Sequence, residues 1–346
     1  MDRYEIIKKL GAGTYGTVYL CRQTDTGRQC VMKRMVLRSL SDKERDSAHQ
    51  EAEVLRNLSH PNIVAYVDAL STRSKLYLIM QFCDGGDLEQ RLQALKKENG
   101  TLPDNQLLDW FVQMTLALQY LHSRRILHRD LKTANVFLTR GNIIKLGDFG
   151  VSRVLNATTE LAKTFVGTPY YLSPELLNNQ PYGHASDTWA LGCIFYEMAT
   201  LEHPFEAKNF PSLAQKILNE LPVSMATYRQ GATVPELEDL TGLMLEKDPT
   251  RRATLPQLLE HQVVQRRMLE FVTEAEQKSA ELAAAPPPAP LQGSGGSGSR
   301  LGSARSGSAS GLLTAHPPAS QHNQHQDQGQ HQHQHQDQHQ HQHQRQ

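Results

Sequence analysis

The sequence lacks an excess of charge of either sign. Lys plus Arg and Asp plus Glu each number 36 in 346 residues, so the formal net charge is zero. A chain whose main partner is nucleic acid or an anionic membrane usually carries a basic excess. No apolar run approaches the roughly 20 residues that cross a bilayer, and the N-terminal MDRYEIIKKL is too polar for a signal peptide. We therefore expect neither nucleic-acid binding nor membrane insertion.

Cysteine is also scarce. The four cysteines, Cys21, Cys30, Cys83 and Cys193, are widely spaced and include no C-x-x-C pair. This pattern is typical of reduced thiols in a protein core and argues against disulfides or a zinc site. We expect a protein of the cytoplasm, where thiols stay reduced.

Composition changes sharply near residue 285. PPPAP, a Gly/Ser-rich stretch and a His/Gln repeat follow in turn. Such tracts bury too little apolar surface to offset the entropy of ordering them, so we expect residues 285–346 to be disordered. The alternating His and Gln of residues 316–346 could bind Zn²⁺ or similar ions. A low-complexity tail without a ligand is the interpretation we favour.

The segment before this tail has the pattern of a helix. Over residues 263–283, one side carries apolar residues at helical spacing. These are Val264, Met268, Phe271, Val272 and Ala275. The segment is too short to indicate a coiled coil, so we expect it to pack back on the domain as a last helix.

A glycine-rich segment gives the first chemical signal. Its residues are Gly11, Ala12, Gly13, Thr14, Tyr15, Gly16, Thr17 and Val18. G-x-G-x-x-G alone is weak evidence, because dinucleotide-binding enzymes use it between a strand and a helix. Here β-branched and aromatic residues follow, which predicts strand, glycines and strand. Such a hairpin can be an ordinary turn, or it can cover phosphates, with Val18 over an adenine.

Lys33 stands at the end of a predicted apolar strand. A functional role for this lysine requires a carboxylate partner. Residues 44–58 supply one, because Ala48, Glu51, Ala52, Leu55 and Leu58 share one face of a predicted helix. A carboxylate within an apolar stripe is costly unless it is paired. We predict a Lys33–Glu51 pair that holds the lysine against the α/β-phosphates of ATP; a solvated Glu51 is the simpler alternative.

The strongest signal is the segment ILHRDLKTAN at residues 126–135, which matches H-R-D-L-x-x-x-N. Asp130 can accept the proton of a substrate hydroxyl, and Lys132 can neutralise charge on a transferring phosphoryl group. Asn135 offers a hard oxygen suited to Mg²⁺. Asp148, in Gly-Asp-Phe-Gly after a predicted strand at 142–146, is the expected second metal ligand.

Together these motifs resemble those of protein kinases, and specifically of the NimA-related (Nek) family. Their order and separations are not expected by chance. The resemblance covers the folded part of the sequence and does not reach the tail. It is carried by LYLIMQFCDGGDL (76–88), HRDLKTANVFLT (128–139), KLGDFGVSRVL (145–155), LAKTFVGTPYYLSPELL (161–177) and YGHASDTWALGCIFYEM (182–198).

The resemblance implies an α+β, bilobal protein kinase fold. A domain at 4–270 would have a small, mostly antiparallel-sheet lobe at about 4–80, a hinge at 81–87 and a mostly helical lobe at 88–270. Residues 271–284 would form a short helical extension. ATP would lie between the lobes. Glu175 would pair with Arg252, and this pair would serve the scaffold, as would Asp187 within the apolar helix 186–199.

The resemblance also assigns a nucleotide site. Met80 would stand at the back of the adenine pocket, Gln81 and Cys83 would bind adenine through their backbone, and Asp87 would lie near the ribose. Val31 replaces the usual alanine above adenine, which makes that surface bulkier. The expected ATP-binding residues are Gly11, Ala12, Gly13, Thr14, Tyr15, Gly16, Val18, Val31, Lys33, Met80, Gln81, Cys83, Asp87 and Phe137.

The expected activity is transfer of the γ-phosphoryl group of ATP, with Mg²⁺, to Ser or Thr of protein substrates. Lys132 and Thr168, which lies ahead of the substrate pocket, resemble their counterparts in Ser/Thr-directed kinases. A pseudokinase scaffold is the alternative, but Lys33, Glu51 and the loop residues are intact. The resemblance points to cytoplasmic work with cytoskeletal, centrosomal or ciliary proteins; oligomeric state is not indicated.

Control is expected in the segment between Asp148 and Glu175. Thr168 directly precedes Pro169, where a bare hydroxyl is more useful than a phosphate. Thr164 lies in a polar stretch, and a phosphate there adds roughly −1.5 to −2 charge that arginine can bind. We predict Thr164 as a regulatory phosphorylation site, against the alternative of an ordinary loop threonine.

Overall fold

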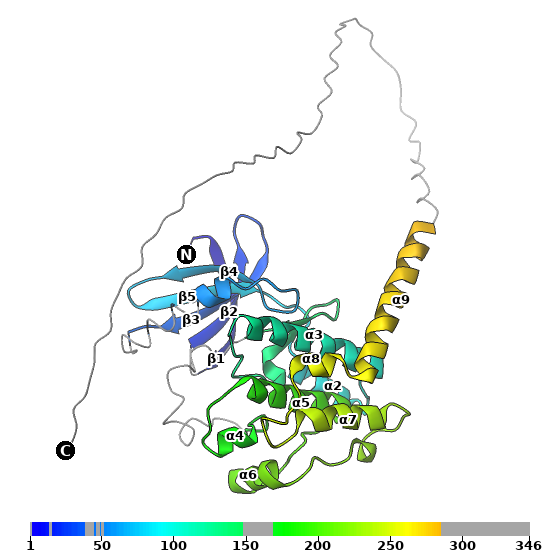
Figure 1. Ribbon diagram of the computed structural model, residues 1–346. Helices are drawn as coiled ribbons and strands as arrows, with labels where there is room; N and C mark the ends of the chain where they lie inside the picture. Colours follow the sequence, from blue (N-terminus) through cyan, green and yellow to red (C-terminus); the bar gives the residue numbers. More distant parts are fainter. Residues whose placement is uncertain are drawn as a thin grey trace, which may run out of the picture. The chain divides into compact units, whose positions relative to one another are not determined.

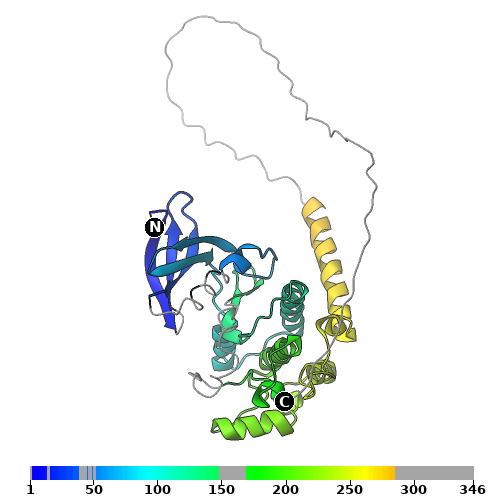
Figure 2. The same ribbon diagram turned by 60° about the vertical axis from the view of Figure 1, so that its left-hand side comes forward.

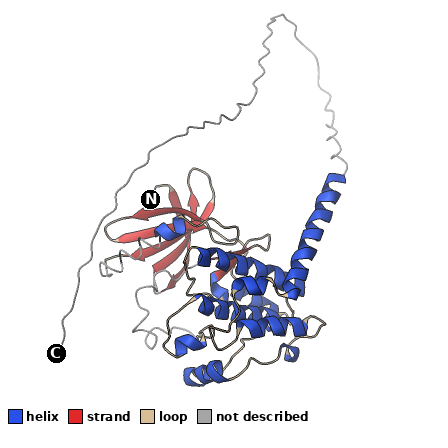
Figure 3. Cartoon of the chain, in the orientation of Figure 1, coloured by secondary structure: helices blue, strands red, loops and turns tan. Residues whose placement is uncertain are grey.

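The computed structural model describes residues 2–13, 16–38, 45, 49, 52–147 and 169–284, leaving aside the side chains of 275 and 278–284. The chain divides into two units, 1–285 and 286–346, and the described residues all belong to the first. Figure 3 shows that this unit has a strand-rich part and a helix-rich part. The predicted fold class is therefore confirmed, whereas the tail lies outside the described residues.

The small lobe is built on a five-stranded antiparallel sheet in the order β1-β2-β3-β5-β4. Its strands are β1 (Tyr4–Gly13), β2 (Gly16–Gln23), β3 (Gln29–Val36), β4 (Tyr66–Ser71) and β5 (Lys75–Gln81). The glycines join β1 to β2 as the predicted hairpin. One face buries Cys21, Cys30, Met32 and Ile79, and all four cysteines of the chain are buried free thiols, as expected.

The predicted helix over residues 44–58 is described only in part. Residues 45, 49 and 52–56 are helical, so the helix ends before Leu58. Ala52 and Leu55 are buried, and Leu58 remains buried beyond the helix end. The three described members of the predicted apolar face are therefore buried as expected, Ala48 and Glu51 lie outside the described residues, and the predicted end of the helix was wrong.

The large lobe is helical. Its helices are α2 (Leu88–Lys97), α3 (Asp104–Ser123), α4 (Pro174–Leu177), α5 (His184–Thr200), α6 (Phe210–Asn219), α7 (Val234–Met244), α8 (Leu255–Leu259) and α9 (Gln262–Ala284), with 3-10 turns η1 (Thr133–Asn135) and η3 (Met225–Thr227). In α5 every residue from Ser186 to Thr200 is buried. Phe111 of α3 meets Phe195 of α5 edge to face at 4.9 Å. Figures 1 and 2 show α5 surrounded by the other helices.

A short hairpin of β6 (Val136–Leu138) and β7 (Ile144–Leu146) follows η1. The strand predicted at 142–146 begins two residues later, because Asn142 has φ 58° in a turn. The Trp110 indole donates to the carbonyl of Asn142 at 2.9 Å, which ties this turn to α3. The hairpin therefore places η1 and Gly147 beside one another, with Gly147 N donating to Asn135 O.

Helix α9 differs from the prediction in its packing. The helix itself is confirmed, and its first turns bury Val263 and Val264. Phe271 and Val272, however, are 54% and 52% exposed, so they do not pack on the domain. Ion pairs from Arg266 and Arg267 to α7 and α3 fasten only the first half. In Figures 1 and 2 the far end of α9, in yellow and gold, stands clear of the other helices.

The predicted Glu175–Arg252 pair is present in the core of the large lobe. The Arg252 guanidinium binds both carboxylate oxygens of Glu175, at 2.8 and 2.9 Å. Ser186 of α5 also donates to Glu175, at 2.7 Å. Although burial opposes it, these hydrogen bonds hold the pKa of Glu175 below its usual value. The pair thus joins α4, α5 and the segment before α8.

No helix among the described residues combines the length and the apolar character of a membrane-spanning segment.

Candidate active site

Strand register gathers the expected nucleotide-binding residues of the small lobe. Val31 of β3 lies opposite Met80 of β5, and Val18 of β2 lies opposite Lys33 of β3. The turn between β1 and β2 closes at Gly16, whose φ is +140°. A Cβ there would lie 2.1 Å from the carbonyl oxygen of Arg34, so no other residue fits. The sheet therefore brings Val18, Val31, Lys33 and Met80 into one neighbourhood.

The hinge segment follows β5. Gln81 N donates to Ala65 O at 2.8 Å. Of the two backbone groups of Gln81, the carbonyl is therefore the one that we expect to bind adenine. Cys83 is buried, and burial raises the pKa of its thiol to about 11. Asp87 caps α2 by accepting from Gln90 N at 2.8 Å. Its backbone also bridges to Phe137, which brings the hinge and β6 together.

Gly147 leaves room for the Phe137 ring because it has no side chain. A Cβ at Gly147 would lie 2.8 Å from Phe137 Cε2 and 3.0 Å from Val64 Cγ2. Because these contacts are closer than real Cβ atoms make, a larger residue at 147 would displace the Phe137 ring or the Val64 side chain. The Gly-Asp-Phe-Gly motif places a glycine before Asp148, but it does not indicate which side chains would clash with a larger residue there.

The expected catalytic residues of the loop are joined by direct contacts. Lys132 Nζ lies 3.0 Å from Asp130 Oδ2. The Asn135 amide group donates both to that oxygen, at 2.9 Å, and to the Asp130 carbonyl, at 2.7 Å. The amide oxygen of Asn135 is thereby turned away from Asp130. A base, a cation and a hard oxygen are thus fixed relative to one another.

A buried carboxylate holds the backbone of this loop. Asp187 of α5 accepts from the main-chain nitrogens of His128, at 3.0 Å, and Arg129, at 3.1 Å. His122 and Tyr182 bind the same carboxylate through their side chains. Although burial acts to raise it, these contacts leave the pKa of Asp187 below its usual value. Arg129 has φ 65°, a conformation that costs a non-glycine residue about 1–3 kcal/mol.

Several predicted residues lie outside the described residues. These are Thr14, Tyr15, Glu51, Asp148, Thr164 and Thr168. The Lys33–Glu51 pair, the second metal ligand and the regulatory threonine therefore stay predictions. Within the described part of the chain, no group of three or more His, Cys, Asp or Glu could hold a metal ion.

Sequence reasoning missed residues on the far side of the loop. The Thr133 hydroxyl lies 2.8 Å from the hydroxyl of Tyr171, which donates to Glu197 Oε2 at 2.6 Å. His203 Nδ1 lies 3.6 Å from the same Glu197 oxygen. A signal was available for Glu197, because it is an acidic residue within an almost wholly apolar helix. Nothing in the sequence marked Thr133 or Tyr171 as its partners.

Glu197 and His203 are both shifted towards their neutral forms. Burial raises the pKa of Glu197 to about 7, although the Tyr171 hydrogen bond acts to lower it. Burial lowers the pKa of His203 to about 4. Near pH 6 the carboxyl is therefore mostly protonated and the imidazole neutral, so their contact at 3.6 Å is not an ion pair at that pH.

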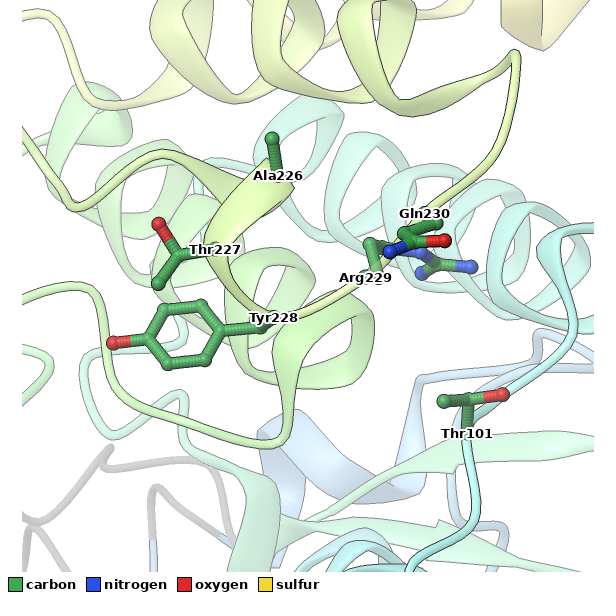
Figure 4. Close-up of a pocket in the computed structure, with 6 residues that line it drawn as sticks. All are labelled: Thr101, Ala226, Thr227, Tyr228, Arg229 and Gln230. Atoms are coloured by element: carbon green, nitrogen blue, oxygen red, sulfur yellow. The ribbon is translucent and has the colours of Figure 1, made fainter.

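A separate hollow lies on the large lobe beside η3 (Figure 4). Its volume is about 340 Å³, and its lining residues are Thr101, Ala226, Thr227, Tyr228, Arg229 and Gln230. The Arg229 guanidinium donates to the carbonyls of Ala199 and Leu102 and pairs with Asp104. None of the expected nucleotide-binding or catalytic residues lines this hollow, and its one charged side chain serves the scaffold.

The Glu197 and His203 shifts predict a pH dependence of stability. Folded Glu197 keeps a proton that the unfolded chain loses near pH 4.5, so its contribution to stability falls as pH rises to its folded pKa of about 7. His203 acts in the opposite sense between about 4 and 6.5. Glu197→Gln removes only the first effect, so the variant should gain stability relative to the parent as pH rises. Urea unfolding at pH 5 and 7.5 measures this difference; equal pH slopes in both proteins would contradict the assignment.

Comparison with known proteins agrees with this geometry. The protein kinase domain family matches residues 4–264. Serine/threonine-protein kinase Nek4 of Mus musculus is 44% identical over 280 residues, covering 80% of this chain and 34% of the relative. Nek1 of Mus musculus is 42% identical over 274 residues, covering 79% and 22%. Nek5 of Homo sapiens is 38% identical over 277 residues, covering 79% and 38%.

The chain thus spans about a fifth to two fifths of the length of these curated relatives. The match nevertheless covers both lobes and every described residue of the candidate site. The chain belongs to the protein kinase family, and its kinase domain is of the Nek type.

Proposed function

We propose that this chain is an active serine/threonine protein kinase that transfers the γ-phosphoryl group of Mg-ATP to protein substrates. The observation that carries the proposal is the loop cluster, in which Asp130 Oδ2 is contacted by both Lys132 and Asn135. A pseudokinase would not need these three side chains in mutual contact. The similarity to Nek serine/threonine kinases supports the same activity.

In this proposal the small lobe and hinge bind the nucleotide, and the loop of the large lobe carries the catalytic residues. Val18, Val31 and Met80 present an apolar surface suited to adenine, and the Gln81 carbonyl can accept from the base. Lys33 of β3 lies directly opposite Val18 of β2 in the sheet. A lysine there can bind phosphate oxygens as a point charge. The small lobe and hinge therefore bind and orient the nucleotide.

The donor set fits a magnesium ion. Mg²⁺ prefers hard oxygen ligands, and the Asn135 amide supplies one because its nitrogen is already committed to Asp130. The carboxylate of Asp148, outside the described residues, would be the other protein ligand. When bound, the ion neutralises charge on the phosphates.

The loop residues perform the acid–base and electrostatic work. Asp130 would accept the proton of the attacking hydroxyl, and its orientation is fixed by the contacts of Lys132 and Asn135. Lys132 would then stabilise the negative charge of the transferring group, since its ammonium lies within 3.0 Å of the base. Positioning of this kind supplies most of the catalysis in phosphoryl transfer.

Substrate class and location extend the proposal. Lys132 and Thr168 favour serine or threonine as acceptor, and the relatives are serine/threonine kinases by name. We propose cytoplasmic substrates of the cytoskeletal, centrosomal or ciliary kind, on the basis of the Nek resemblance. Imaging of a tagged chain together with proximity labelling would test this placement.

Loss of the loop base tests the chemistry. Asp130→Asn, Asp148→Asn or Lys33→Met should each lower phosphoryl transfer by orders of magnitude with the fold retained, because each removes a charged group that acts on the acceptor hydroxyl, the metal ion or the phosphates. Radiolabel transfer to a peptide library measures the effect, and the exposed Asp25→Asn is the matched control. Near-parental turnover of Asp148→Asn would overturn the kinase proposal. Predominant phosphotyrosine in the product would overturn the assignment to serine and threonine.

Activation is proposed to require phosphate on Thr164. The added charge can order its segment by pairing with an arginine such as Arg129 or Arg153. Thr164→Ala should therefore cut activity strongly, whereas Thr159→Ala in the same stretch should not. Phosphatase treatment should lower activity of the parent and leave Thr164→Ala unchanged. Full activity of the Thr164→Ala protein would show that the modification is not needed.

A further inference from the structure

A hydrogen-bond network joins the catalytic loop to helix α5 through the segment before α4. Its members are Thr133, Tyr171 and Glu197, with separations of 2.8 Å between Thr133 and Tyr171 and 2.6 Å between Tyr171 and Glu197. Thr133 is the first residue of η1, the turn that ends at Asn135. We call these three residues the Thr133 network.

The direction of the hydrogen bonds follows from the chemistry of the groups. A phenol has one hydrogen, and Tyr171 gives it to the Glu197 carboxylate. Thr133 must then donate its own hydrogen to the Tyr171 oxygen. If Glu197 takes up a proton, both bonds can reverse without breaking. Tyr171 therefore connects a loop hydroxyl to a helix carboxyl in either protonation state.

Burial strengthens the hydrogen bonds of the Thr133 network and limits the access of water to it. Thr133 is 2% exposed and Glu197 is 8% exposed, so water competes little for their hydrogen bonds. The neutral His203 ring stacks on Tyr170 at 3.9 Å and meets Tyr171 edge to face at 6.0 Å. Its Nδ1 atom lies beside Glu197. The His203 ring therefore contacts both Tyr171 and Glu197.

Helix α5 consequently holds the loop at two places. Asp187, near its start, binds the main-chain nitrogens of His128 and Arg129. Glu197 lies about 15 Å further along the axis, at roughly 1.5 Å per residue, and reaches Thr133 through Tyr171. Asp130 lies between these two attachments. Asn135 lies just beyond the second.

We propose that the Thr133 network positions the catalytic loop for phosphoryl transfer. The Thr133 hydroxyl fixes the position of η1, and η1 in turn fixes the positions of Asn135 and Asp130. The inference rests on the proposed kinase activity. Thr133 touches neither nucleotide nor acceptor in this account, so it is a positioning residue. Its effect should appear in turnover and in Mg²⁺ dependence, because Asn135 is the side chain that η1 carries.

The test compares Thr133→Val, which removes the hydroxyl at constant shape, with Thr133→Ser, which keeps it. Steady-state kinetics should show about a tenfold lower kcat for Thr133→Val, a higher Mg²⁺ concentration at half-maximal rate and an ATP KM within about twofold of the parent. Thr133→Ser should stay within about twofold in kcat. Tyr171→Phe should behave like Thr133→Val. The double variant should be no worse than either single one, because both break one network.

Hydrogen exchange of residues 128–136 provides a readout that does not depend on activity. Exchange should rise in Thr133→Val and Tyr171→Phe and stay parental in Thr133→Ser. Parental kcat in Thr133→Val, an equal loss in Thr133→Ser, or unchanged exchange in Thr133→Val would overturn the network. An inactive parent would instead overturn the proposed function, and the exchange comparison would still decide the network.

Discussion

The buried carboxylate of Asp187 is the interaction on which the candidate site depends. Removing a carboxylate from water is costly, and four hydrogen-bond donors offset that cost here. Two of them are main-chain nitrogens of the loop that precedes Asp130. The positive φ of Arg129 is a consequence, because the loop must turn to present successive nitrogens to one carboxylate. A local strain is thus maintained by a buried charge.

This arrangement requires a helix that does not move. Helix α5 is buried along its whole length from Ser186, and its neighbours α3 and α7 pack on it through apolar side chains. The Glu175–Arg252 pair adds a second buried electrostatic contact beside its first turn. The small lobe, by contrast, is a sheet whose register brings together the residues that are expected to bind the nucleotide. In the proposed activity, the large lobe positions the residues that act on the acceptor, while the small lobe positions the nucleotide.

Much of this could be predicted from the sequence, for reasons that differ between elements. The glycine hairpin and the strand at Lys33 follow from local patterns, and the Glu175–Arg252 pair followed from the resemblance. Helix α9 was correctly predicted as a helix from its periodicity. An apolar stripe cannot show where the neighbouring helices end, however, so the prediction that Phe271 and Val272 pack on the domain was wrong. The partnership of Thr133, Tyr171 and Glu197 joins three distant segments, and no local pattern specifies such a contact.

Asp187 holds the main chain of the catalytic loop through its contacts with His128 and Arg129. Asp187→Asn keeps the shape of the side chain but turns an amide donor towards groups that are themselves donors. Steady-state kinetics and calorimetric ATP binding on the same protein measure the consequence. We predict a kcat at least about tenfold lower, with ATP affinity close to that of the parent, because the residues proposed to bind the nucleotide lie in the small lobe and hinge. A parental kcat in a folded Asp187→Asn protein would contradict it.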